Sequence, residues 1–207
     1  FYEAYLQASH VVCDSRILLI AARLLGWPVA DQIAGADLLP AWCQAHGDDP
    51  GVRVFLLGGT TADAAQRAAS HLDTLAGRPV VCGVFSPPRG FEGDAFQLAH
   101  IQQLIRDADA TVVAVGVGAP KQELWITRHR ALFPNVKLWM AVGATIDFLG
   151  GYRRRAPVWM TRVGLEWAYR LVQEPGRLAR RYLLDDLPVL GWLLLQRLGL
   201  YRNPWSS

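Results

Sequence analysis

The sequence predicts an open α/β sheet of the doubly wound kind, followed by a helical appendage. Five short apolar runs alternate with stretches of helical periodicity, and the runs are apolar on both faces, as parallel strands buried between helix layers are. After Gly150-Gly151 no further strand is evident, and Trp, Leu and Arg become frequent. We therefore predict a first domain over residues 1–150 and an appendage over residues 151–207.

The five predicted strands share a feature at their ends, because one leads into an aspartate and three lead into glycine. Ligands of an open parallel sheet bind beyond the carboxyl ends of its strands, so these residues are expected to line one rim. The predicted strands are His10–Cys13, Val52–Leu57, Pro79–Gly83, Thr111–Val115 and Val136–Val142. The helices predicted around them span 15–26, 35–46, 61–76, 94–107 and 120–132, and those of the appendage span 157–172, 175–184 and 187–199.

The net charge of +3 hides an asymmetry along the chain. From Gly150 onward there are ten Arg, no Lys and four acidic residues, a net +6, while the 11 basic and 14 acidic residues before it give −3. Such a distribution indicates an anionic partner for the appendage.

The three cysteines, Cys13, Cys43 and Cys82, are widely separated and outside any CxxC pattern, and the five histidines show no ligand-like spacing. A disulfide framework or a zinc site is not expected, and a reducing cytosol fits better. Leu187–Leu195 is the longest apolar run of the appendage, well short of the ~20 residues that span a bilayer. The chain opens on Phe1 rather than Met, so we expect a trimmed sequence.

Asp14 directly follows a predicted strand and precedes a helix. A carboxylate in that place can act as a general base, which is typically worth about 10²–10⁴ in rate. The alternative is that Asp14 caps the following helix, and the spacing alone favours that role.

The segment Gly116–Glu123 is a candidate phosphate site. Gly116 and Gly118 let a ligand approach the backbone, Pro120 suits the first position of a helix, and the N–H groups beside it would suit a phosphate at the positive end of the helix dipole. Lys121 adds positive charge, and Gln122 and Glu123 offer polar contacts. An ordinary strand-to-helix turn is the alternative. A dinucleotide fingerprint would need a third glycine where Lys121 stands, which argues against an NAD-dependent oxidoreductase.

The appendage combines arginines with Trp and Tyr. Arg binds phosphates with a forked geometry, and Trp and Tyr favour the headgroup layer of a bilayer. A solvated basic face or a subunit contact would explain the same residues, whereas no recognisable nucleic-acid module is present. The arginines assigned to a diphosphate or the membrane are Arg154, Arg155, Arg170, Arg177, Arg180 and Arg181.

Five stretches of this chain resemble the WecG/TagA/CpsF glycosyltransferase family (glycosyltransferase family 26). The similarity runs in order from about Val11 to Tyr182. The stretches are FLLGG (Phe55 to Gly59), VGVGAPKQE (Val115 to Glu123), VGATIDFLGG (Val142 to Gly151), RRAPVW (Arg154 to Trp159) and GLEWAYRLVQEPGRLARRY (Gly164 to Tyr182).

The resemblance implies a Rossmann-like, mostly parallel sheet and an inverting transfer of a sugar from a UDP-sugar to a polyprenyl-diphosphate-linked acceptor. The products of such enzymes are capsule, exopolysaccharide or teichoic-acid units, made at the inner face of the cytoplasmic membrane. Asp14 occupies the place of the family's base, and no metal or cofactor is required. The donor site implied comprises Gly58, Gly59, Gly116, Gly118, Pro120, Lys121, Gln122, Glu123, Gly143 and Asp147.

Three departures from the family pattern favour keeping a second hypothesis about the function. Cys13 and Ser15 flank Asp14 where Ala and Gly are usual, and Gln32 stands where Arg is frequent. The family's amino-terminal strand, with its Thr and Asn pocket residues, also lies outside this sequence. The alternative is a catalytically weak homologue that binds nucleotide or lipid as an assembly partner. The apolar appendage is compatible with self-association into a homo-oligomer.

Overall fold

The protein, as a computed structural model, divides into two compact units, which are described separately below. The first unit comprises Phe1–Val11 and Ala34–Arg154, and the second comprises Val12–Ile33 and Arg155–Ser207. The residues that the structure describes are 2–173, 175–180, 184 and 187–201.

The first unit is built on a four-stranded sheet in the order β2-β1-β3-β4, with every neighbouring pair parallel. The predicted open α/β fold is therefore confirmed. Four of the five predicted strands are present, each shifted by one or two residues at its ends. The strands are β1 (Val54–Gly58), β2 (Val81–Phe85), β3 (Val112–Gly116) and β4 (Leu138–Ala141).

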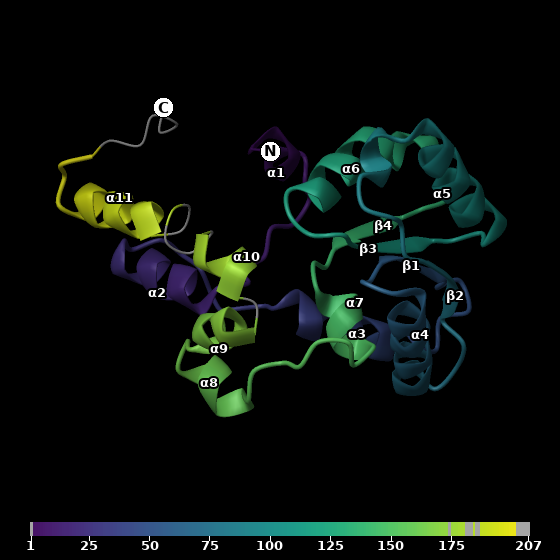
Figure 1. The fold of residues 1–207 in the computed structure, drawn as a ribbon, viewed down its shortest axis with the longest axis horizontal. Coiled ribbons are helices and arrows are strands. Elements are labelled where there is room, and N and C mark those ends of the chain that lie inside the picture. The colour runs from purple at the N-terminus through teal and green to yellow at the C-terminus, as the bar shows by residue number, and fades with distance from the viewer. Residues whose placement is uncertain (1, 174, 181–183, 185–186, 202–207) are drawn as a thin grey trace. The chain divides into compact units, whose positions relative to one another are not determined.

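Helices cover both faces of this sheet. Successive side chains of each strand point to opposite sides, so the apolar strands need a helix layer on each face. Leu56 and Ala114 pack toward one helix layer, whereas Phe55 and Val113 pack toward the other, and all four are at most 2% exposed. Helices α3, α4 and α7 form the first layer, and α5 and α6 form the second (Figure 1). Each fully buried Leu or Phe stabilises the fold by about 1.5–3 kcal/mol.

Most helices of the first unit lie where the sequence predicts them. Two short helices, α1 and α7, are additions, because five residues are too few to display a helical period. The helices of the unit are α1 (Tyr2–Leu6), α3 (Gly35–Ala45), α4 (Ala62–Ala76), α5 (Ala95–Asp107), α6 (Lys121–His129) and α7 (Thr145–Leu149), with 3₁₀ turns η1 (Phe91–Gly93) and η2 (Arg130–Leu132).

The strand predicted at His10–Cys13 is wrong. These residues belong to no strand, and Val11 and Val12 are 59% and 42% exposed. The Cys13 carbonyl accepts a hydrogen bond from the Ile33 N–H instead of a ladder partner. A four-residue apolar run has no period of its own, and here it is the stretch in which the chain passes from the first unit to the second.

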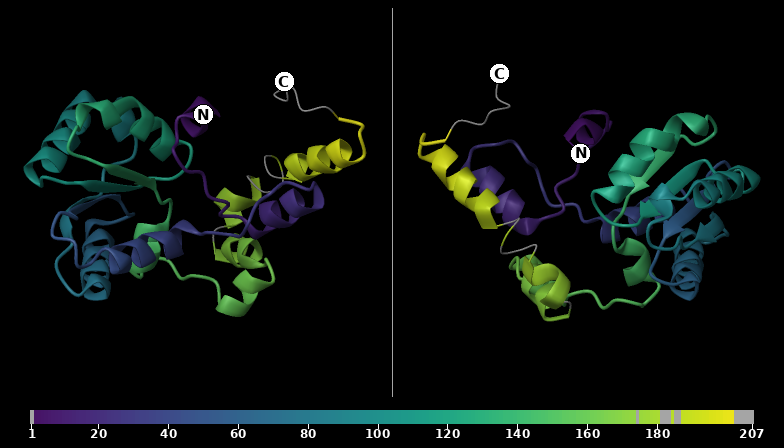
Figure 2. Two further views of the ribbon diagram at one scale, coloured as in Figure 1. Left: turned by 180° about the vertical axis from the view of Figure 1, so that it is seen from behind. Right: turned by 45° about the horizontal axis from the view of Figure 1, so that its top comes forward.

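The second unit consists of helices, without a strand among its described residues. The continuous helix predicted over 157–172 is wrong, because Gly164 adopts φ +79° and separates α8 from α9. Residues 12–33, which the sequence analysis assigned to the first domain, lie in this unit through α2. Figure 2 shows α2 beside α11, and the two helices are in contact. The helices are α2 (Arg16–Leu24), α8 (Val158–Arg162), α9 (Glu166–Gln173), α10 (Pro175–Arg180) and α11 (Leu187–Arg197).

Candidate active site

The order of the strands places a topological switch point between β1 and β3. The chain leaves β1 through α4 toward β2, and it later leaves β3 through α6 toward β4 on the other side of the sheet. α4 and α6 cover opposite faces, so the chain diverges at the carboxyl ends of β1 and β3, which is where doubly wound proteins bind their ligands.

Glycines from three strand ends meet at this switch point. Gly58 ends β1, Gly116 ends β3, and Gly143 follows β4. A Cβ atom on Gly58 would lie 2.5 Å from the Gly116 carbonyl oxygen, and one on Gly116 would lie 2.7 Å from the Gly143 carbonyl oxygen. The three backbones therefore touch directly, and only glycine fits at Gly58 and Gly116. Gly59 continues the first turn with φ +90°.

A buried carboxylate fills the turn after β1. Asp147, on α7, is 7% exposed and accepts two hydrogen bonds from Thr60, from its N–H at 2.6 Å and from its hydroxyl at 2.8 Å. The Arg153 Nε atom lies 3.1 Å from the second carboxylate oxygen and supplies the countercharge. Thr60 immediately precedes Thr61, the N-cap of α4, so the chain's own anion occupies the positive end of that helix.

The turn after β3 is held by a buried side-chain amide. Gln122 is 5% exposed, and its Oε1 atom accepts hydrogen bonds from the N–H groups of Gly118 at 3.3 Å and Gly143 at 3.0 Å. Its Nε2 atom donates to a Glu123 carboxylate oxygen at 2.9 Å. The N–H of Gly118 is thus satisfied within the chain, in contrast to the sequence expectation of free amides around this turn.

Pro120 is the N-cap of α6 rather than its first residue, and no side chain caps the helix there. The Ala119–Pro120 peptide bond is cis. Lys121 opens the helix, and its ammonium lies 2.5 Å from a Glu92 carboxylate oxygen on η1. The hydrogen bond from Lys121 lowers the pKa of the Glu92 carboxyl from its ordinary value. Sequence reasoning found Lys121 but missed its acidic partner.

Asp14 belongs to the second unit, where it is exposed just before α2. The N-cap of α2 is Ser15, whose hydroxyl accepts from the Leu18 N–H at 3.4 Å, so capping does not explain the aspartate. The Asp14 backbone carbonyl accepts a hydrogen bond of 2.6 Å from the Gln32 side chain. Gln32 thus ties two loops of this unit together.

The arginines assigned to acceptor or membrane are distributed over several segments. Arg154 ends the first unit, Arg155 continues into the second, and Arg170 lies on α9. Arg177 and Arg180 lie on α10, with their side chains outside the described residues, and Arg181 lies outside them altogether.

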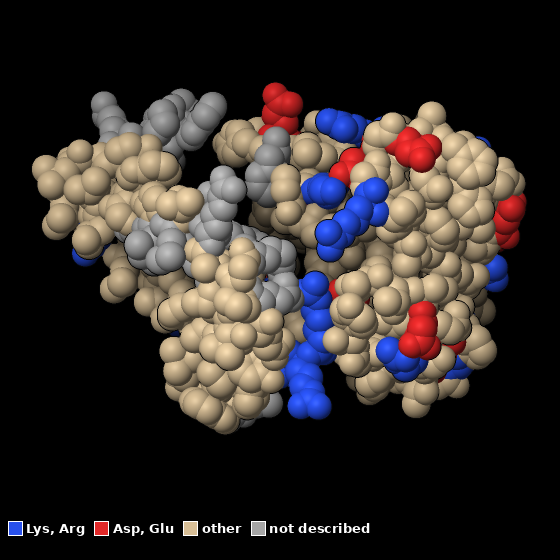
Figure 3. Space-filling view, viewed as in Figure 1, with Lys and Arg blue, Asp and Glu red and all other residues tan. Residues whose placement is uncertain are grey.

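Apolar side chains are prominent on the second unit. Trp159 on α8 is 62% exposed, and Trp192 on α11 is 52% exposed. On the face that Figure 3 shows, the described surface of these helices is largely without charged side chains. Within the described part of the chain, no helix is long and apolar enough to cross a bilayer.

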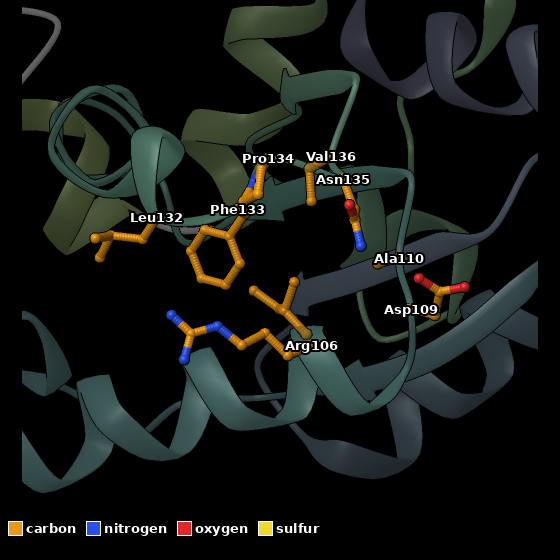
Figure 4. Close-up of a pocket in the computed structure, with 9 residues that line it drawn as sticks. Arg106, Asp109, Ala110, Leu132, Phe133, Pro134, Asn135 and Val136 are labelled. Carbon is orange, nitrogen blue, oxygen red and sulfur yellow. The ribbon is translucent and has the colours of Figure 1, made fainter.

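A small hollow of about 190 Å³ lies at the other edge of the sheet, beside the residues that precede β3 and β4. In Figure 4 the Phe133 ring points into it, and the Arg106 guanidinium lies 5.7 Å from the centre of that ring. None of the predicted site residues lines it, and it is smaller than the ~300–1,000 Å³ of ordinary ligand pockets. We therefore place the candidate site at the glycine turns.

Among the described residues, no three His, Cys, Asp or Glu side chains are grouped so as to hold a metal ion.

Comparison with known protein families gives a match that covers nearly the whole chain. The model of the Glycosyl transferase WecG/TagA/CpsF family matches residues 1–203.

Proposed function

The chain belongs to the Glycosyl transferase WecG/TagA/CpsF family, and on this premise we propose that it is an inverting transferase that uses a UDP-sugar donor. The acceptor proposed is a sugar linked to polyprenyl diphosphate, and the product a unit of cell-surface polysaccharide or teichoic acid. Membership of the family supports glycosyl transfer, whereas donor, acceptor and product are our inference.

The switch point between β1 and β3 is the observation that carries the donor site. Gly118 and Gly143 lie beside it with open space where a Cβ atom would stand, so a diphosphate can approach the backbone closely there. Asp147 occupies the first turn, which leaves the turn after β3 for the donor. Pro120 leaves the amino end of α6 without a side-chain cap, and the helix dipole together with Lys121 favours an anion there.

Asp14 is the base of the proposed reaction. Its carboxylate accepts the proton of the acceptor hydroxyl while the hydroxyl oxygen forms a bond to the anomeric carbon of the donor sugar. The bond from that carbon to the β-phosphate oxygen breaks as the new bond forms, so UDP leaves with the electron pair and the configuration inverts. The exposure of Asp14 and the capping of α2 by Ser15 support this role.

The second unit is proposed to bind the lipid-linked acceptor at the inner face of the cytoplasmic membrane. Arginines suit the acceptor diphosphate, and exposed tryptophans suit the headgroup layer. Each basic residue near an anionic surface contributes about 1 kcal/mol. This assignment rests on the family match and on the exposed Trp159 and Trp192.

Two measurements on the whole chain test the proposal. Calorimetric titration is expected to show micromolar binding of UDP and none of NAD. With labelled UDP-sugars and membrane extract, Asp14→Asn is expected to lower the transfer rate at least about 100-fold while UDP affinity stays within about twofold. Asp48→Asn, an exposed aspartate of the first unit, is the matched control and should behave as wild type.

Each outcome has a distinct meaning. Full transfer by Asp14→Asn would remove Asp14 from the chemistry, and a wild-type chain that does not bind UDP would remove the donor assignment. Binding of UDP by the wild type without transfer to any extract would favour a nucleotide-binding assembly partner. The motive for that second candidate is the set of departures at Cys13, Ser15 and Gln32.

A further inference from the structure

Two backbone N–H groups from different turns converge on a single side-chain oxygen beside the switch point. Gly118 lies in the turn after β3, and Gly143 lies in the turn after β4. Both donate to Oε1 of Gln122, which is 5% exposed and comes from the first turn of α6. The Gln122 backbone N–H donates in return to the Gly118 carbonyl at 3.1 Å, so the helix and its preceding turn are joined twice.

The hydrogen-bonding capacity of this amide is largely used within the protein. A side-chain carbonyl oxygen has two lone pairs, and here it accepts two N–H groups. One of the two donors on Nε2 is taken by Glu123. A donor molecule that contacted Oε1 would have to displace one of the glycine N–H groups, which would then lose its partner.

Both glycines have open space where a side chain would stand. Gly118 has φ +90° and Gly143 has φ +58°, and a Cβ atom built on either would meet nothing within 4 Å. Neither turn is therefore held by side-chain packing at that point. The Gln122 amide oxygen accepts from both glycines and so links the two turns directly.

We propose that Gln122 is a positioning residue that sets the spacing of the Gly118 and Gly143 turns, and that donor binding depends on it through those turns. The inference rests on the proposed function, because it assumes that the donor diphosphate binds beside the turn after β3. Preorganised backbone groups bind a ligand without reordering, so loss of the clamp should appear as weaker donor binding.

The test follows individual glycine amides in the ligand-free protein. Selective ¹⁵N-glycine labelling of the full chain makes the 19 glycines visible, and hydrogen exchange reports each N–H separately. In Gln122→Met, which removes the acceptor at similar size, exchange of both Gly118 and Gly143 should rise at least about tenfold. Gln122→Glu combined with Glu123→Gln retains an oxygen acceptor for the two glycines and a donor–acceptor pair between residues 122 and 123, and it should restore protection of both amides.

Donor affinity is measured on the same samples. Gln122→Met should weaken UDP binding and raise the donor KM by about tenfold, with a smaller change in kcat. Gln103→Met is the matched control, because Gln103 is an exposed glutamine whose amide donates to the Asp107 carboxylate on α5. If Gln122→Met does not fold, Gln122→Asn replaces it, since the shorter amide cannot reach both glycines.

Two results would overturn the inference. Weaker UDP binding with unchanged exchange at both glycines would make Gln122 a direct ligand contact. Faster exchange with unchanged UDP affinity would leave the clamp without a part in donor binding. Both of these results compare a variant with the wild type. The proposed function, in contrast, is contradicted if the wild-type protein itself does not bind UDP.

Discussion

At the scale of single residues, two buried polar side chains organise the rim of the sheet. Asp147 serves the turn after β1, and Gln122 serves the turns after β3 and β4. Both side chains are buried, because Asp147 is 7% exposed and Gln122 is 5% exposed. Buried polar groups stabilise a fold only while their partners are present, so each is a sensitive point for substitution.

Asp147→Asn should destabilise the protein by about 1–3 kcal/mol. The amide can still accept from the Thr60 N–H, but its NH₂ group would face either the Thr60 hydroxyl or the Arg153 guanidinium, and Arg153 would lose its countercharge. Urea unfolding followed by circular dichroism measures the change. Asp63→Asn is the control, because Asp63 forms an exposed ion pair with Arg67 and should cost less than about 1 kcal/mol. Equal losses for the two variants would contradict a special role for the buried carboxylate.

The sequence predicted the residues of this rim better than their contacts. Gly58, Gly116 and Gly143 were found because glycine after an apolar run is a local signal. Thr60 and Asp147 lie 87 positions apart, and no local pattern indicates that they are bonded. The resemblance indicates Asp147 as a donor contact, and this stays a prediction; in the structure its carboxylate accepts from Thr60 and lies beside Arg153.

At the scale of elements, Lys121 at the amino end of α6 pairs with η1 and is also proposed to bind the donor. Glu92 on η1 holds Lys121 at 2.5 Å, and a donor phosphate would compete for the same ammonium. An exposed ion pair is worth about 0.2–1 kcal/mol, so this competition is modest. The competition nevertheless predicts a measurable change in UDP affinity when Glu92 or Lys121 is substituted.

Glu92→Gln should strengthen UDP binding by up to roughly fivefold, because Lys121 is released and one negative charge is removed. Lys121→Met should act in the opposite direction. Because the pKa of the Glu92 carboxyl is lowered, the carboxyl stays charged through and below its ordinary titration range and is neutralised only as the pH falls through the lowered value. The gain should therefore be constant from about pH 6 to about pH 8. Calorimetric titration at several pH values measures it, and unchanged affinity in both variants would separate Lys121 from the donor.

Strands and long helices were predicted well, and short or connecting segments were not. The strands β1, β3 and β4 have apolar side chains on both faces, which only a covered parallel sheet explains. His10–Cys13 has the same composition over four residues but links two units. The break at Gly164 was missed because a glycine within a helical pattern is often tolerated, and its positive φ shows only in the structure.

At the scale of the whole molecule, the chain divides into a sheet unit and a helical unit with different surfaces. The sequence analysis predicted a boundary near residue 150, and the structure divides the chain between Arg154 and Arg155. It also assigns Val12–Ile33 to the helical unit, where α2 contacts α11 from the other end of the chain. An amphipathic helix shows that it needs a partner but not which partner, so this pairing could not be predicted.

That pairing changes how membrane docking should be tested. Removal of the residues after Gly151 would strip α2 of its partner and expose Leu19 and Ala22, which are 0% and 6% exposed in the intact unit. A truncated chain would then associate through α2, whether or not the appendage binds lipid. Surface substitutions in the full chain avoid this difficulty.

Trp159→Ser combined with Trp192→Ser should reduce sedimentation of the full chain with anionic phosphatidylglycerol vesicles by about fivefold or more, because two exposed indoles leave the headgroup layer. Binding of the wild type should also fall as salt is raised, since the arginines of the unit contribute electrostatically. Phe96→Ser is the control, because Phe96 is 75% exposed but belongs to the sheet unit. If the double variant and the control sediment like wild type, the exposed tryptophans serve another contact, and a change in oligomeric state between wild type and the double variant would identify it as self-association.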